Sequence, residues 1–325
     1  KFGDEKWRGH LYGSGRFAIS PEWQWGFGVE TQTDDLYDRR YDIEGQGKRR
    51  GIYLSQPRRL LSQLYAVGQG DSYYTDVAML SFQGLRAGDV DGSLPTITPL
   101  YFGEKYWDLG DYGFASVNAS TAVLTRDVGS DSRRASVGAD WSTLRVLPGG
   151  FTFKPFAELR GDYYSLEKQY AGTDSASRVV GNTGVELSYP LVRPGENVDI
   201  MVEPTVMAAW GFSNVNDPNI PNEDSLLFEA DASNLFQPSA TSGYDLYEGD
   251  GKIPAGLTTR AVWKNGTQIS TTVGRRWRSR SDPSFSEATN LDGTTSDWVV
   301  SATADMGSLL RVDTQSGKVK HFRPH

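Results

Sequence analysis

The chain has 325 residues and a formal net charge of -8, with 33 Lys and Arg, 41 Asp and Glu, and no Cys. This length is enough for one large β-barrel or another large core, and the lack of Cys excludes disulfides within the segment. The acidic balance and the scattered basic residues argue against nucleic-acid binding. Mean hydropathy is -0.49, and no apolar run approaches the roughly 18 residues of a spanning helix, which excludes a helical membrane protein.

The aromatic content points to β structure. Aromatic residues make up 12% of the chain and include nine Trp and 16 Tyr. A transmembrane β-barrel combines low mean hydropathy with many aromatic rings, because half of each strand faces water and the rings collect at the membrane interfaces. A soluble β-sandwich or propeller also uses alternation and aromatics, so composition leaves both classes open.

About thirteen runs have the character of strands, bounded by the Gly, Pro, Asn and Asp residues that favour turns. In chain order they cover residues 7–20, 22–33, 59–68, 72–82, 112–126, 134–146, 151–164, 178–189, 198–212, 254–263, 267–277, 297–306 and 308–314. Many of these runs have about ten to fourteen residues, whereas strands of globular proteins usually have about five or six. We therefore predict an all-β fold, a large antiparallel transmembrane β-barrel.

Short connections alternate with long ones along the chain. Residues 147–150 and 193–196 are tight turns with Pro and Gly, whereas residues 34–50 and 212–253 form long connections. Short turns at one end and long loops at the other are typical of bacterial outer-membrane barrels. We expect the protein in the outer membrane of a Gram-negative cell, with extracellular loops and periplasmic turns.

The run 198–210 shows the two-faced pattern most clearly, because apolar side chains alternate with acidic and hydroxyl side chains. The run 178–189 shows it as well. The apolar set of both runs is predicted to face lipid: Val198, Ile200, Val202, Val206, Trp210, Val185, Leu187 and Tyr189.

Ionisable side chains recur on the opposite faces of the predicted strands and in the adjoining turns. The set predicted to line the lumen is Arg126, Asp140, Lys154, Glu158, Arg160, Asp162, Glu186, Asp199 and Glu203. A wide hydrated interior would bring these side chains into contact with a polar head group, a partner protein or ordered water. The alternative for each is an ion pair with a neighbouring strand, for example Glu158 or Asp162 with a cross-strand Arg, worth about 0.2–1 kcal/mol.

No catalytic signature occurs in the sequence. The three His lie at positions 10, 321 and 325, and the residues around Ser14 lack the first Gly of a nucleophile elbow. Phosphate-binding and dinucleotide-binding glycine motifs are also missing. We therefore predict that the protein is not an enzyme and uses neither a cofactor nor a metal.

Two charged loops are candidate binding segments. Residues 34–41 form either a self-paired surface loop or a rim that meets phosphates or divalent cations at a charged lipid surface. Residues 217–225 carry oxygen ligands for Ca²⁺ but lack EF-hand spacing, and a solvated loop ordered by Asx turns is the simpler interpretation. The candidate residues are Asp34, Asp35, Arg39 and Arg40 in the first loop and Asn222, Glu223 and Asp224 in the second.

A series of short motifs extends over nearly the whole chain. They include Arg8-Gly9-His10, Trp23-Gln24-Trp25-Gly26, Asp34-Asp35-Leu36-Tyr37-Asp38-Arg39-Arg40-Tyr41, Phe156-Ala157-Glu158-Leu159-Arg160-Gly161-Asp162-Tyr163-Tyr164, Ile220-Pro221-Asn222-Glu223-Asp224-Ser225 and Ser242-Gly243-Tyr244-Asp245. Each motif alone is weakly specific, but in this order they resemble the barrel of the LptD family of LPS-assembly proteins, in the style of its alphaproteobacterial members.

The resemblance implies a barrel of around 26 strands, joined to a periplasmic jelly-roll domain and opened by a seam between its first and last strands. Residues 1–325 are then a transmembrane barrel segment, and the jelly roll, the seam strands and the remaining strands are expected outside this chain. The implied partners are an LptE-type plug lipoprotein in the lumen, a periplasmic LPS bridge protein acting through the jelly roll, and LPS. Two features depart from the family: this segment lacks the Cys for interdomain disulfides, and Leu246 stands where Arg is usual.

The function implied by the resemblance is translocation of LPS and its insertion into the outer leaflet of the outer membrane. Another outer-membrane barrel, a porin or a TonB-type receptor, is the main alternative, and a complete even-stranded barrel without a jelly roll would indicate it. A barrel enzyme and a soluble β-rich binding protein also stay open, although only His10 is available for a His-based catalytic site.

Overall fold

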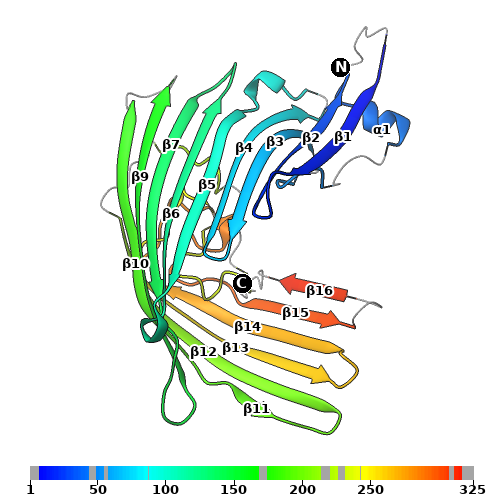
Figure 1. Cartoon of the computed structure of the whole chain (residues 1–325). Coiled ribbons are helices and arrows are strands. Elements are labelled where there is room, and N and C mark those ends of the chain that lie inside the picture. The colour runs from blue at the N-terminus through cyan, green and yellow to red at the C-terminus, as the bar shows by residue number, and fades with distance from the viewer. Residues whose placement is uncertain are drawn as a thin grey trace, which may run out of the picture.

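The computed structural model describes residues 7–43, 49–54, 58–86, 88–167, 174–213, 220–225, 231–241, 243–306 and 311–316. In this part of the chain, a single antiparallel sheet of 16 strands contains most of the regular structure. Figure 1 shows that the sheet curves into an open wall, with its first and last strands at the two edges. Within the described ranges, no helix is both long and apolar enough to cross a membrane.

The strands pair with their neighbours in chain order. They are β1 (His10–Ala18), β2 (Trp23–Gln32), β3 (Arg59–Gly70), β4 (Tyr73–Gly84), β5 (Thr96–Asp108), β6 (Phe114–Thr125), β7 (Asp131–Ser142), β9 (Thr152–Glu167), β10 (Ser175–Ser188), β12 (Val198–Ser213), β13 (Asp250–Trp263), β14 (Gln268–Arg278), β15 (Val299–Asp305) and β16 (Arg311–Ser316). Two short strands, β8 (Arg145–Val146) and β11 (Leu191–Arg193), pair with β9 and β12. The helical turns are α1 (Tyr37–Tyr41), η1 (Asp91–Ser93), η2 (Gly110–Tyr112) and η3 (Glu287–Thr289).

The predicted all-β antiparallel fold is confirmed, but β5 was not predicted. Pro99 lies within this strand, and its register with β4 shifts between Ala78 and Leu80. Such a bulge places one extra residue on a strand and changes the face of the residues that follow. As a result, Ile97 and Leu100 both pair with buried residues of the adjacent strands, which hides the period of two.

The connections have different lengths at the two ends of the wall. Residues 19–22, 71–72 and 264–267 are short turns at one end, whereas residues 33–58, 214–249 and 279–298 connect strands at the other. We refer to these as the turn end and the loop end. This is the arrangement that the sequence predicts for an outer-membrane barrel. Of the predicted run 308–314, residues 308–310 lie outside the described residues.

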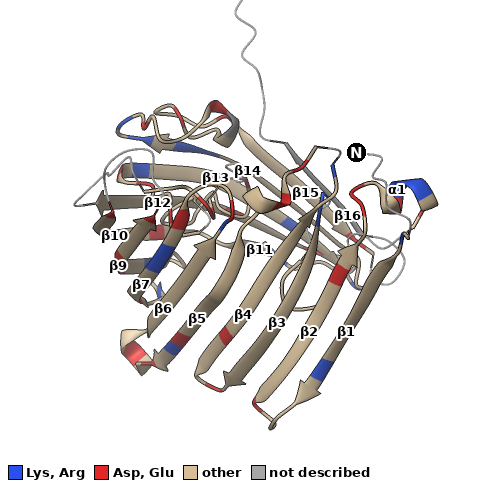
Figure 2. Ribbon diagram, turned by 90° about the horizontal axis from the view of Figure 1, so that it is seen from above, with Lys and Arg blue, Asp and Glu red and all other residues tan. Residues whose placement is uncertain are grey.

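The two faces of the wall differ in exposure. In β12, Val206 and Trp210 are exposed on the convex face, whereas Met207 and Ala209 are buried on the concave face. Figure 2 shows the curvature of the wall from above. Because successive side chains of a strand point to opposite faces, this alternation gives each strand one outward and one inward set.

Aromatic side chains gather on the convex face near both ends of the strands. At the turn end, Phe17 stacks on Trp25 with ring centroids 4.7 Å apart, and Phe151 stacks on Tyr189 at 4.4 Å. Exposed rings at the loop end include Trp210, Trp277 and Trp298. Two such belts are typical of strands that cross a bilayer, whose two water interfaces favour aromatic rings.

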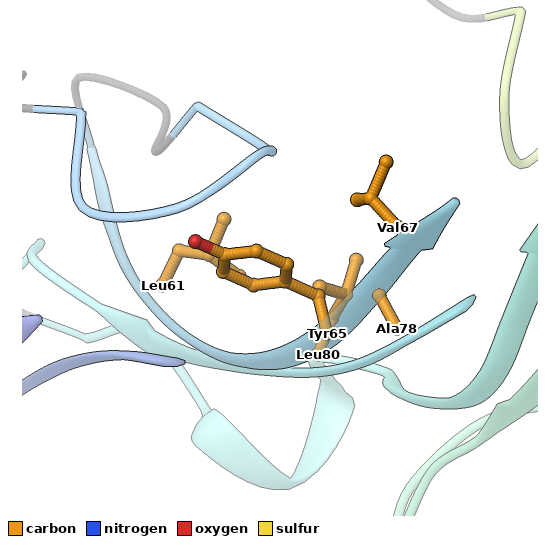
Figure 3. Packing of buried hydrophobic residues seen from close by; sticks show 5 residues of the cluster. All are labelled: Leu61, Tyr65, Val67, Ala78 and Leu80. Atoms are coloured by element: carbon orange, nitrogen blue, oxygen red, sulfur yellow. The ribbon is translucent and has the colours of Figure 1, made fainter. Parts of the chain in front are cut away.

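The concave face is apolar over β3 and β4, which differs from the hydrated interior predicted from the sequence. The cluster shown in Figure 3 consists of Leu61, Tyr65, Val67, Ala78 and Leu80. Ile52 and Tyr53, from the long connection before β3, pack against it. Because this connection covers the cluster, its apolar side chains are removed from water even though they point inward.

We expect Gly26→Ala to lower the free energy of unfolding by about 1–3 kcal/mol through overpacking beside this cluster. A Cβ at Gly26 would lie 2.5 Å from the Tyr65 hydroxyl oxygen and 2.6 Å from the Gly15 carbonyl oxygen. Urea unfolding from lipid vesicles, followed by tryptophan fluorescence, measures the change. Gly13→Ala in the paired strand is the control, since nothing lies within 4 Å of its Cβ position. Equal losses in both variants would contradict the packing argument.

Candidate functional site

The connection between β12 and β13 folds back onto the concave face of the wall. We call its described residues, 220–225, 231–241 and 243–249, the inserted loop. Figure 1 shows this connection on the inner side of the curved sheet. Side chains of β7, β9, β10, β13 and β14 hold it through two networks of buried charges, which together with the loop form the candidate site.

Asp245 is at the centre of the first network. Its carboxylate accepts hydrogen bonds from Arg134 at 2.9 Å and from the Tyr164 hydroxyl at 3.1 Å, both on the inner wall. The backbone N–H groups of Glu223 and Asp224 donate to its other oxygen at 2.8 and 3.2 Å. Asp245 therefore fixes two separate parts of the inserted loop to each other and to the wall.

Tyr244 lies among three arginines. The guanidinium carbons of Arg134 and Arg160 are 4.3 and 4.8 Å from the centre of its ring, which is cation–π geometry. Its carbonyl oxygen accepts hydrogen bonds from Arg160 and Arg178 at 2.7 and 2.6 Å. Asp162 balances these charges, with contacts of 2.8 Å to both Arg160 and Arg178. The register partner of Asp162 on β10 is Arg178, so this contact is a cross-strand ion pair.

The second network surrounds Glu248. Glu248 and Arg276 have fully buried side chains that form an ion pair of 2.7 Å. Arg278 lies 3.2 Å from the second carboxylate oxygen of Glu248, and the Lys252 ammonium donates to the Glu248 carbonyl oxygen at 2.6 Å. Arg276 also donates to the Leu235 carbonyl oxygen at 2.9 Å. Three cations of β13 and β14 thus hold one acid of the inserted loop.

The surrounding charges set the pKa values of the loop carboxylates. Burial alone would raise the pKa of Glu248, but the charges of Arg276 and Lys252 outweigh burial and hold it below its ordinary value of 4.5. Burial is likewise opposed at Asp224, where the charge of Arg134 and backbone N–H donors lower the pKa. Burial and the nearby charge of Asp224 raise the pKa of Asp245.

Acid is expected to release the loop from the second network. Because the pKa of Glu248 is below 4.5 in the folded state, its stabilising contribution is complete above about pH 5 and disappears as the pH falls through the folded-state value. Hydrogen exchange of loop peptides across this pH range, corrected for the intrinsic exchange rate, measures the release. The variant Glu248→Gln is expected to remove most of the pH dependence. Wild-type protection that stays constant down to about pH 3 would contradict this assignment.

The structure places the predicted lumen set on the concave face and its rims. Arg160 and Asp162 belong to the first network, and Arg126 pairs with Glu223 of the inserted loop at 2.6 Å. Four others line a cavity of about 320 Å³ between the wall and the loop: Asp140, Lys154, Glu158 and Glu186. Contact of this set with a head group or a partner stays a prediction.

Two members of the lumen set make local contacts near the turn end. Glu203 accepts a hydrogen bond from the Ser188 hydroxyl at 2.7 Å. Asp199 accepts one from the backbone N–H of Gly195 at 3.0 Å. Asp199 therefore stabilises the turn between β11 and β12, and the structure does not bring it to the inserted loop.

The predicted lipid set lies on the convex face. Its exposed members are Ile200, Val206, Trp210 and Leu187, and its half-buried members are Val198, Val202, Val185 and Tyr189. Val202 pairs with Leu191 of β11. Contact of these side chains with lipid stays a prediction.

The acidic candidate loop is part of the inserted loop. Glu223 and Asp224 bind wall arginines, and the Asn222 side-chain oxygen accepts a hydrogen bond from the Ser225 backbone N–H at 2.9 Å. Residues 217–219 lie outside the described residues. Across the described ranges, no group of three or more His, Asp or Glu side chains is placed to hold a metal ion.

The other candidate loop lies at the loop end, beside the first strands (Figure 1). Asp34 pairs with Arg8 at 3.5 Å, and Arg39 and Arg40 belong to α1. Burial raises the pKa of Asp35. The Arg8 contact joins Asp34 to the segment before β1, and contact of the loop arginines with phosphates stays a prediction.

Most of the side chains that hold the inserted loop were not predicted. These are Arg134, Tyr164, Arg178, Asp245, Glu248, Lys252, Arg276 and Arg278. The strand period could have placed the wall arginines on the concave face. Arg134 alternates in step with Ser136 on β7, and Arg178 alternates in step with Asn182 on β10. The loop acids carried none, because no strand period specifies their placement.

Comparison with known proteins identifies the family of this chain. The model of one family, LptD, described as LPS transport system D, matches residues 6–316, a range that contains every strand of the sheet. A search of curated proteins finds no significant match. The family match covers nearly all of the chain, so this protein belongs to the LptD family of LPS transport proteins, which act at the outer membrane.

Proposed function

We propose that this chain forms part of a barrel wall that translocates LPS and inserts it into the outer leaflet of the outer membrane. The observation that carries the proposal is that the two faces of the wall differ in polarity, in a member of an LPS transport family. The convex face exposes apolar side chains, whereas the concave face carries charged ones. LPS has the same division, because its acyl chains are apolar and its sugar head is polar and anionic. The concave face suits the head, and the convex face suits the chains.

The proposed passage requires no reaction of the substrate. A closed barrel pairs the backbone groups of every strand, so no strand edge meets lipid while the sugar head is solvated inside. Energy would come from the periplasmic bridge that delivers LPS at the turn end, through a jelly-roll domain outside this chain. The long connections would then be extracellular.

An LptE-type lipoprotein is the proposed occupant of the concave space next to the inserted loop. The cavity of about 320 Å³ offers such a partner both hydrogen-bond acceptors and aromatic side chains. Glu158 and Glu186 line it together with Phe156 and Phe236. A photoreactive amino acid at Asp140 of the full-length protein should crosslink to the lipoprotein in cells. The same probe at Val137, which is 61% exposed on the convex face, is the control and should not crosslink to it.

Depletion of the full-length protein in its native cells tests the proposed function. Pulse-labelled LPS should accumulate before the outer membrane and fail to reach the surface, as measured by its modification by a surface-acting enzyme. A porin or a TonB-type receptor would instead leave surface LPS unchanged and reduce uptake of a solute. Normal delivery of LPS after complete depletion would refute the proposal.

A further inference from the structure

One arginine differs from its neighbours on the convex face of the wall. Over β12 to β15, all of which the structure describes, the convex face carries apolar, aromatic, small and hydroxyl side chains and one charged side chain, Arg275. The adjacent residue Arg276 points inward and is fully buried against Glu248. Alternation along β14 therefore directs Arg275 outward, near the loop end.

The Arg275 guanidinium lies beside one ring of the aromatic belt at the loop end. Its carbon lies 5.8 Å from the centre of the Trp298 ring, and its Nε donates to the Ser296 carbonyl oxygen at 2.6 Å. Trp277 and Trp298 are 41% and 47% exposed. The side chain is therefore held in place through one of its five N–H donors, and the remaining donors form no hydrogen bond with a described residue.

Among the described residues, no acid forms an ion pair with Arg275. Asp250 of β13 faces the concave side opposite Gly211 and is engaged by Arg280 at 3.0 Å. A second outward arginine at the loop end provides a contrast, because Arg133 of β7 is paired with Glu167 at 2.9 Å. The wall thus supplies an acid for one outward arginine and leaves the other open to an external anion.

We propose that Arg275, Trp277 and Trp298 form a binding site for a phosphate group on the lipid A part of an outer-leaflet LPS molecule. A guanidinium presents parallel N–H donors that match phosphate oxygens, and tryptophan rings lie at the level of lipid head groups. Exposed Ile253 and Trp210 on the same face would contact the acyl chains. The assignment to LPS rests on the proposed function, which places the loop end in the outer leaflet.

Native mass spectrometry of the detergent-solubilised full-length protein, titrated with bisphosphorylated lipid A, tests the site. Arg275→Gln should weaken retention of one lipid A molecule by about tenfold, the effect of losing one charge-assisted contact. Arg133→Gln is the matched control and should retain lipid A as the wild type does. Arg275→Lys keeps the charge and should recover part of the binding, which separates a phosphate contact from a folding defect.

Two further lipids identify the ligand. Dephosphorylated lipid A should bind wild type and Arg275→Gln equally, and phosphatidylglycerol should bind the wild type more weakly than lipid A does. Equal retention of bisphosphorylated lipid A by wild type and Arg275→Gln would overturn the site, and tighter binding of phosphatidylglycerol would overturn the choice of LPS. Failure of the Arg275 site would leave the proposed transport of LPS standing, because the depletion experiment tests that separately. Conversely, normal surface LPS after depletion would refute the transport proposal without changing the measured lipid A binding of the two variants.

Discussion

Glu248→Ala is expected to lower the free energy of unfolding by about 3–5 kcal/mol, because it removes the acid from a buried group of cations. Arg276, Arg278 and Lys252 have 0%, 7% and 2% of their surface exposed, and each lies against Glu248. Without this carboxylate, they would repel one another inside the wall. Urea unfolding of the full-length protein in lipid vesicles measures the loss, and hydrogen exchange shows whether it is centred on the inserted loop.

The control for this variant is an ion pair of the same type on the surface. Arg280 pairs with Asp250 at 3.0 Å, but its side chain is 71% exposed. Arg280→Gln should therefore change the free energy of unfolding by no more than about 0.5 kcal/mol. If Glu248→Ala proved as stable as Arg280→Gln, with an unchanged exchange pattern in the loop, the buried network would not be what holds the loop to the wall.

Val206→Arg should destabilise the protein in vesicles by about 2–4 kcal/mol, the cost of a cation near the middle of a bilayer. Val206 lies in the middle of β12, is 40% exposed on the convex face, and pairs with Leu187 and Ala255. Its surroundings are apolar on both sides, so a guanidinium there has no acid to bind. Unfolding monitored by tryptophan fluorescence gives the free-energy difference from the wild type.

Glu203→Arg tests the other face of the same strand. Glu203 points to the concave side, where its carboxylate binds the Ser188 hydroxyl at 2.7 Å. Its replacement should cost less than about 1 kcal/mol, because a charged side chain there stays in water. A similar cost at positions 203 and 206 would show that the convex face is not in hydrocarbon.

The wall is predictable from the sequence because its signal is local. A period of two needs only neighbouring residues, so the opposite faces of Val206 and Glu203 follow from β12 alone. In β5 the same signal fails, since a bulge puts Ile97 and Leu100 on one face. The inward apolar cluster also escapes prediction, because its cover comes from a different segment of the chain.

The contacts of the inserted loop lie beyond the reach of such patterns. Arg134 and Asp245 are 111 positions apart, and Arg276 and Glu248 are 28 positions apart. Each acid has several basic residues within the chain as possible partners, and the choice depends on how a long connection crosses the wall. The resemblance to LptD identified the motif that contains Asp245, but it did not specify a contact for that residue.

The topology of the sheet also implies an order of assembly. Apart from the short strands β8 and β11, each strand of the sheet pairs with the strand that precedes it in this order along the chain. Hairpins can therefore form and insert one after another, and each closes only a short loop at little cost in chain entropy. The bond between Arg134 and Asp245 spans 111 positions. It requires that the six strands from β7 to β12, including the short strands β8 and β11, are in place first. The wall is therefore expected to form before the inserted loop docks on its concave face, and slow docking would be visible as a late kinetic phase after the strands have formed.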